Sequence, residues 1–218
     1  NVMGEEQILA WPDAMAKTLD VENPWFQKYV EFLEALVERS AGRYPISHGA
    51  ELGPTDLHAL VRGHSGSIID LVDAPEKSAE LLMHLGHLFV QFFQEAWKRL
   101  PLYHGGYFDA QYQVWAPEPI IRMQEDATAL FSPNLYRRLV QPVDRMMAQQ
   151  FPCNFIHLHT TSMFILDAFL EIEEIRCFEI NIESFNIPVA GMIKYYQMVQ
   201  NANRSLLLRG SFTEDEIR

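Results

Sequence analysis

Predicted strands and helices alternate along the second half of the chain, and each predicted strand is apolar on one side and polar on the other. These two observations predict an α/β fold, a (β/α)8 TIM barrel that is incomplete in this chain, with about five parallel strands. The sequence has 218 residues, of which 48% are hydrophobic and 21% charged, so it can build one sizeable core. We therefore expect residues 1–218 to form a single barrel domain that lacks one or both ends.

The first half of the chain has a mostly helical pattern. Asn23 and Pro24 form an N-cap and a first-turn proline, apolar residues then recur at helical spacing, and Gly42 ends the helix. The short apolar piece 44–48 is expected to be an early strand. Helical pattern returns from Thr55 and dominates 75–100.

The second half alternates between the two kinds of element. Strands are predicted at 119–126, 154–159, 176–183 and 205–210, and helices at 132–150, 162–171 and 188–201. Thr213-Glu214-Asp215-Glu216 is a capping box that opens a further helix. A complete barrel has eight strands, so we expect at least the last strand, and early ones as well, to be absent.

The polarity of the strand faces separates a barrel from an open sheet. In 176–183, Phe178 and Ile180 point to one side, whereas Glu179 and Asn181 point to the other. Strands of an open doubly wound sheet are apolar on both faces, because helices cover both. Polar residues gathered on one face, toward the C-terminal ends of the strands, instead suit the mouth of a barrel, where active sites of this architecture lie.

Composition excludes several classes of partner. The net charge is −12 and the pI is near 5.0, so the surface repels nucleic acid and anionic lipid. No apolar run approaches the length of a membrane span, and the first residues do not resemble a signal peptide. The two cysteines, Cys153 and Cys177, make no disulfide framework, so a cytoplasmic location is expected.

Several segments, taken in order and spacing, carry a family resemblance. Leu52-Gly53-Pro54-Thr55-Asp56-Leu57, followed by Asp70-Leu71-Val72-Asp73-Ala74-Pro75-Glu76, is similar to a G-P-x-x-L…L-x-D-x-P-E stretch. Gln124-Glu125-Asp126 followed by Ser132-Pro133-Asn134-Leu135-Tyr136-Arg137 is similar to D-x-x-x-x-x-S-P-x-x-Y-R, and Ile156-His157-Leu158-His159 to a strand I-x-H-x-C. These motifs resemble the uroporphyrinogen decarboxylase superfamily over residues 24–218, nearest to its unassigned decarboxylase-like barrels related to corrinoid-dependent methyltransferases.

The resemblance implies an enzyme that acts on or with a tetrapyrrole or corrinoid, and two chemistries are open. Decarboxylases of the superfamily remove acetate carboxyls without a cofactor and carry a tyrosine where this chain has Ala59 or Leu60. That difference slightly favours the other chemistry, methyl transfer from a methylcorrinoid to a thiol. Cofactor-free decarboxylation of uroporphyrinogen-type acetates remains an alternative, as does a non-catalytic barrel that binds a small carboxylate or a corrinoid protein.

The superfamily's methyltransferases also suggest a metal. They take zinc ligands from a His-x-Cys pair on a middle strand, and a third ligand from a late strand. Here His157 and His159 occupy the pair, and two histidines on one strand face can chelate one ion. The same imidazoles can instead bind a substrate carboxylate, so zinc and no cofactor at all are both expectations.

The other candidate residues are expected to line the same mouth. Asp126 and Glu179 are the catalytic candidates: Glu179 could supply a carboxylate ligand or a general base, and Asp126 occupies a position where the resemblance implies a substrate-facing residue. The expected substrate-binding residues are Gln124, His48, Asn181 and Arg209, the last by a forked hydrogen bond to a carboxylate. The structural alternative is that these polar groups cap loops or, for Arg209, form a salt bridge. Tyr107 and Trp115, in the long loop 103–119, either roof a flat ligand or pack the loop.

The expected partners follow from the same resemblance and from the incomplete barrel. They are a small-molecule or tetrapyrrole/corrinoid substrate and a corrinoid protein, with no nucleic acid and no membrane. An incomplete barrel exposes strand edges and interior apolar surface, so a homodimer is also expected.

Overall fold

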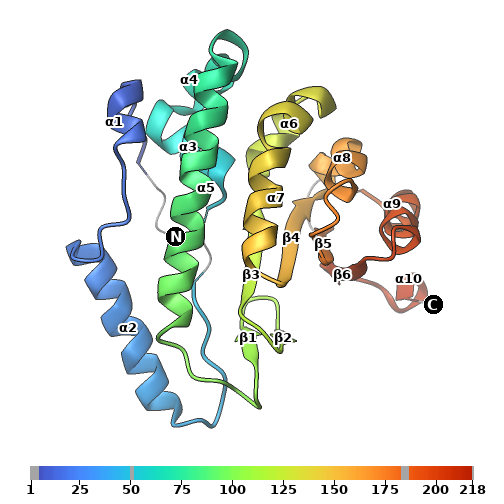
Figure 1. The fold of residues 1–218 in the computed structure, drawn as a ribbon. Coiled ribbons are helices and arrows are strands. Elements are labelled where there is room, and N and C mark those ends of the chain that lie inside the picture. The colour runs from blue at the N-terminus through green and yellow to red at the C-terminus, as the bar shows by residue number, and fades with distance from the viewer. Residues whose placement is uncertain (1–4, 50–51, 183–186, 218) are drawn as a thin grey trace.

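A parallel sheet of four strands, in the order β3-β4-β5-β6, organises the C-terminal half of the chain (Figure 1). The computed structural model describes residues 5–49, 52–182 and 187–217. Its strands are β1 (Tyr107–Asp109), β2 (Val114–Ala116), β3 (Ile120–Gln124), β4 (Cys153–His159), β5 (Cys177–Asn181) and β6 (Ser205–Arg209). The parallel, sequential strand order that the alternation predicted is therefore confirmed, and the sheet is a partial (β/α) barrel that does not close.

Helices precede the sheet and follow each of its strands. The helices are α1 (Trp11–Met15), α2 (Pro24–Ser40), α3 (Pro54–Arg62), α4 (His64–Asp73), α5 (Pro75–Trp97), α6 (Pro133–Leu139), α7 (Gln141–Gln150), α8 (Leu166–Leu170), α9 (Val189–Asn201) and α10 (Glu214–Ile217), with the 3₁₀ helices η1 (Asp126–Leu130) and η2 (Thr160–Ile165). Figure 1 shows α5 and α7 side by side next to β3 and β4, with α8 and α9 beyond them. No helix in the described part of the chain is long and apolar enough to cross a membrane.

Local signals in the sequence explain where several helices begin and end. The Asn23 side chain accepts a hydrogen bond from the Trp25 amide at 2.9 Å, which caps α2 as predicted. Thr213 and Glu216 form the predicted capping box at α10. The single helix expected over 132–150 is divided at Val140, because Pro142 has no amide hydrogen to continue the ladder.

Two predictions for the first half of the barrel were wrong. Residues 44–48 form no strand, since Pro45 cannot donate to a ladder and the segment pairs with no strand in the described ranges. The described residues therefore contain four parallel strands, and not the five that we predicted. The segment 103–119, expected to be a loop, contains the antiparallel hairpin of β1 and β2.

The strand register produces the two faces that the alternation predicted. Met123, Ile156 and Phe178 are neighbours across β3, β4 and β5, and all three are buried in the core shared with α5 and α7. One position along, Gln124, His157 and Glu179 form the neighbouring row on the opposite face. The polar row therefore lies on the inner face, close to the C-terminal ends of the strands.

The start of α3 packs directly against the end of β3. A Cβ added to Gly53 would lie 1.4 Å from the Gln124 carbonyl oxygen, so no larger residue fits there without moving the backbone. The Thr55 amide in the first turn of α3 donates a hydrogen bond to Glu125 Oε2 at 2.9 Å. This contact fixes the segment that follows β3, which contributes to the site below.

Candidate metal and substrate site

A cavity of about 390 Å³ opens at the C-terminal ends of the parallel strands. All four strands, or the residues just after them, contribute to its wall. Its lining residues are Leu52, Gln111, Tyr112, Arg122, Gln124, Asp126, His157, His159, Asn181 and Arg209. The cavity is therefore built mainly from polar and charged side chains around an entrance to solvent.

Three of these side chains are close enough to share one metal ion. Asp126, His157 and His159 each offer a ligand atom, and the three atoms lie within 4.8 Å of one another. The Nε2 atoms of the two histidines are 3.1 Å apart, and His159 Nε2 is 3.8 Å from Asp126 Oδ1. His157 is buried and Asp126 is 40% exposed, so the group spans the cavity from floor to rim.

Glu179 lies beneath His157 and orients its ring. Its side chain is fully buried, and Glu179 Oε2 accepts a hydrogen bond from His157 Nδ1. With the proton on Nδ1, the lone pair of His157 Nε2 is directed toward His159 and the cavity. A carboxylate on the far nitrogen is the usual outer partner of a metal-binding histidine.

A chain of side chains orients Asp126 in the same way. Arg122 donates hydrogen bonds to the Gln124 side-chain oxygen and, at 3.3 Å, to the Tyr112 hydroxyl. The Gln124 amide in turn donates to Asp126 Oδ2 at 2.6 Å. One carboxylate oxygen of Asp126 is thus occupied, and the other faces His159.

Another part of the cavity lining is cationic and aromatic. The Arg209 guanidinium lies 4.7 Å from the centre of the Tyr112 ring, and Arg122 lies 5.6 Å from the same ring. The Tyr112 hydroxyl is 3.3 Å from His157 Nδ1. Burial raises the pKa of Tyr112, so the hydroxyl keeps its proton at neutral pH.

The structure brings together most of the residues that the strand patterns indicated. Gln124, His157, His159, Asn181 and Arg209 all line the cavity. Asp126 lines it too, but as the first residue of η1, since β3 ends at Gln124. Glu179 is not part of the lining and reaches the cavity through His157.

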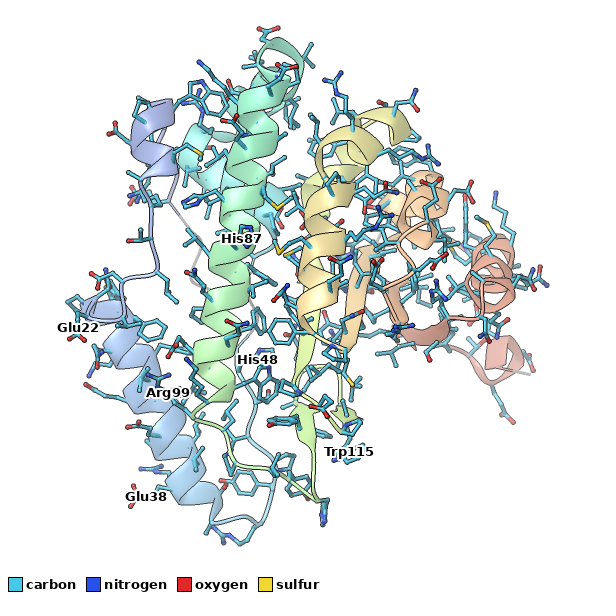
Figure 2. The ribbon with its side chains drawn as sticks, in the orientation of Figure 1. Glu22, Glu38, His48, His87, Arg99 and Trp115 are labelled. Carbon is cyan, nitrogen blue, oxygen red and sulfur yellow. The ribbon has the colours of Figure 1, made fainter. Side chains whose placement is uncertain are left out.

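His48 does not belong to this site, contrary to expectation. Its ring is buried and packs on Phe93 and Trp97 of α5, with ring centres 4.4 and 4.9 Å away, and Figure 2 labels His48 beside this helix. His48 Nδ1 donates to the Gly49 carbonyl at 2.6 Å, and burial lowers the pKa of His48, so it is neutral. The prediction failed because 44–48 is not a strand, so period-two alternation does not apply to it.

The hairpin supplies a residue that sequence patterns did not single out. Tyr112, between β1 and β2, contacts His157, Arg122 and Arg209. Trp115 is exposed, and its indole nitrogen donates a hydrogen bond to the Tyr103 carbonyl at 3.0 Å (Figure 2). Tyr107 packs on Trp97 at 5.1 Å. Neither Tyr107 nor Trp115 lines the cavity, so in this structure they pack the hairpin and do not roof the site. No sequence periodicity distinguishes Tyr112 from its aromatic neighbours.

Comparison with known proteins gives a similarity of fold. No family model matches the chain, and no curated protein matches it in sequence. Among solved structures, a methyltransferase from Methanosarcina mazei is similar, with a TM-score of 0.63 and 12% sequence identity. The match covers 95% of this chain and 65% of that protein's chain, so this chain spans less than two thirds of it. At this identity the similarity shows a common fold.

Proposed function

We propose that the chain is part of a zinc-dependent methyltransferase barrel. In this proposal His157, His159 and Asp126 hold the ion at the mouth of the barrel. The observation that carries the proposal is the convergence of these three ligand atoms, with Glu179 on the far nitrogen of His157. Two imidazoles and a carboxylate form the donor set of several catalytic zinc sites, and they leave a fourth position for substrate. The fold of the Methanosarcina mazei methyltransferase supports the reaction class.

A zinc ion bound here would lower the pKa of a coordinated thiol and so supply a thiolate at neutral pH. The chain's own residues prepare the site for that role. Glu179 keeps the proton on His157 Nδ1, and Gln124 holds the Asp126 carboxylate in one orientation. Arg209, at the rim, is placed to bind an anionic group of the substrate. The methyl donor would be a methylcorrinoid, as in the methyltransferases that the sequence resembles.

A second function is favoured by a different observation in the same cavity. Arg122 and Arg209 both lie close to the Tyr112 ring and line the cavity, which suits a ligand that carries a carboxylate. The cavity would then bind, or decarboxylate, a small carboxylate without any metal, and the two histidines would contact the carboxylate. The metal content of the protein separates the two functions.

Zinc titration of the purified chain, with competition by a chromophoric chelator, tests the first proposal. We expect about one zinc ion per chain, and a loss of at least about 100-fold in affinity for His157→Ala and for His159→Ala, because even outer partners contribute that much. His87→Ala is the matched control, since His87 is exposed on α5 away from the cavity (Figure 2). A folded wild-type chain that binds zinc no better than His157→Ala would overturn the proposal.

Reactivity is tested with methylcobalamin as the donor and 2-mercaptoethanol as the acceptor. Loss of the methylcobalamin absorbance should depend on the chain and on zinc, and should disappear in His157→Ala. If the chain binds zinc but transfers no methyl group, the metal site would stand and the proposed reaction class would be contradicted.

A further inference from the structure

An apolar groove adjoins the candidate site along α5. One cavity of about 230 Å³ lies between α3, α5 and the segment 17–19, and Leu52 lines both this cavity and the cavity of the candidate site. A second hollow of about 380 Å³ continues it toward the start of α2 and shares Thr18, Leu19 and Phe92 with it. We call these two hollows together the α5 groove.

The inner part of the α5 groove has a mainly apolar wall, whereas the outer part also contains Thr18, Asp20 and Asn23. Its inner part is lined by Leu57, Val61, Leu85, Leu88 and Phe89, from the facing sides of α3 and α5. Its outer part is aromatic. The centre of the Phe92 ring lies there 5.0 Å from that of Tyr29 and 6.0 Å from that of Phe26. A hydrogen bond of 2.7 Å between His84 Nε2 and the Lys17 carbonyl holds the covering segment against α5. This hydrogen bond fixes the segment 17–19 as one wall of the groove.

The two neighbouring cavities have opposite chemistry. The candidate site presents arginines, histidines and a carboxylate, whereas beyond Leu52 the lining changes to leucine, valine and phenylalanine. A ligand that occupies both must have a polar head and a hydrocarbon part. Apolar surface of this kind is costly to leave in water, and an alkyl chain that fills it would gain about 0.8 kcal/mol per buried methylene.

We propose that the α5 groove binds the hydrocarbon part of an amphipathic substrate whose polar head lies among His157, His159 and Arg209. This inference rests on the proposed function for the identity of the head, which would be a thiol for methyl transfer. The groove itself depends only on the residues that line it, so its occupancy can be tested separately from the metal.

The test measures the dissociation constants of a series of linear thiols, from ethanethiol to octanethiol, by calorimetry with the zinc-loaded chain. Affinity should rise about fourfold for each added methylene, the fold-change equivalent to the burial of one methylene group. Leu88→Trp fills the groove and should remove the gain for the longer thiols without affecting ethanethiol. His87→Trp is the control, because it adds the same side chain at the preceding position of α5, where the residue is exposed and lies outside the groove.

The outcomes separate the groove from the metal site. The same series of linear carboxylates, measured in EDTA, should show the same dependence on chain length if the groove holds the hydrocarbon part. If zinc fails to bind but that dependence persists, the proposed function fails and the groove stands. The proposal would be overturned if affinity did not depend on chain length. It would also be overturned if His87→Trp removed the gain for the longer thiols as fully as Leu88→Trp does. Leu57→Glu, a charge in the same wall from α3, is a second variant if Leu88→Trp does not fold.

Discussion

Two polar clusters lie at the end of β3, each with at least one carboxyl group, and they differ in burial. The open cluster consists of Asp126, His157 and His159 and faces the cavity. The sealed cluster consists of Glu125, Tyr136 and Asp144 and lies between β3 and the helices α6 and α7. Glu125 and Asp126 are adjacent in the chain, yet Glu125 is 1% exposed and the Asp126 side chain is 40% exposed.

Burial gives the two clusters different chemistry. Tyr136 donates a hydrogen bond to Asp144 Oδ2 at 2.6 Å, and the Thr55 amide donates one to Glu125 Oε2. Burial raises the pKa of Asp144 to about 7 and the pKa of Glu125 well above its ordinary value. A carboxyl that retains its proton serves as a structural hydrogen-bonding group, whereas an exposed carboxylate beside two imidazoles can bind a cation. The contrast shows that position relative to solvent, more than residue type, assigns the roles.

The largest effect is expected where both clusters are disturbed together. Gly53→Ala places a Cβ against the Gln124 carbonyl and close to Glu125 Oε1, which forces α3 away from β3. We expect a loss of on the order of 3 kcal/mol in the free energy of unfolding, measured by urea denaturation. Gly66→Ala is the control: a Cβ meets nothing within 4 Å inside α4, so the change should stabilise the chain by roughly 0.5–1 kcal/mol. Equal stabilities for the two variants would show that α3 is not packed on β3 as described.

A change beneath the open cluster should affect metal binding and spare stability. Glu179→Gln keeps the shape of the side chain but weakens the hydrogen bond from His157 Nδ1. Zinc affinity should fall by roughly 10- to 100-fold in a chelator competition assay. The matched change in the sealed cluster, Asp144→Asn, should leave zinc affinity unchanged. A comparable loss of zinc affinity in Asp144→Asn would show that the two clusters are not functionally separate.

The converse holds for the sealed cluster, where stability should change and metal binding should not. Tyr136→Phe removes the hydroxyl that donates to Asp144 and leaves a buried carboxyl with one partner fewer. The free energy of unfolding should fall by about 1–3 kcal/mol. The same deletion at exposed Tyr44 should change it by less than about 0.5 kcal/mol. An unchanged stability in Tyr136→Phe would argue against the Tyr136–Asp144 hydrogen bond.

The last prediction concerns the pH dependence of stability, which is measured as a slope per pH unit. Asp144 binds its proton more tightly in the folded chain, with a pKa raised from 3.8 to about 7. Folding therefore takes up a proton between these values, and stability falls as the pH rises through this window. The contribution is fully present below pH 3.8 and lost above about 7.

Asp144→Asn, which cannot titrate, should flatten this dependence. The difference in slope from wild type should reach at most about 1.4 kcal/mol per pH unit, measured by urea denaturation at several pH values. Parallel curves for the two proteins would show that Asp144 is ionised in the folded chain.

Local patterns were enough to predict much of this molecule. Strict alternation along β4 placed His157 and His159 on one face, since successive side chains of a strand must point to opposite sides. The caps of α2 and α10 were likewise visible in the sequence, because each depends on residues within one helical turn. The sequential parallel order followed from the alternation of strands and helices.

Only the tertiary structure decided which polar residues meet. Tyr112 reaches His157 because the hairpin folds over the sheet, and Pro45 and the surrounding rings place His48 in the core instead of on a strand. The opposite environments of Glu125 and Asp126 depend on distant segments. Thr55 of α3 and the Tyr136–Asp144 pair of α6 and α7 lie on the side of Glu125, whereas the Asp126 side chain faces the cavity. Secondary structure is determined by neighbours in sequence, whereas burial and the pKa values that follow from it depend on segments far away in the chain.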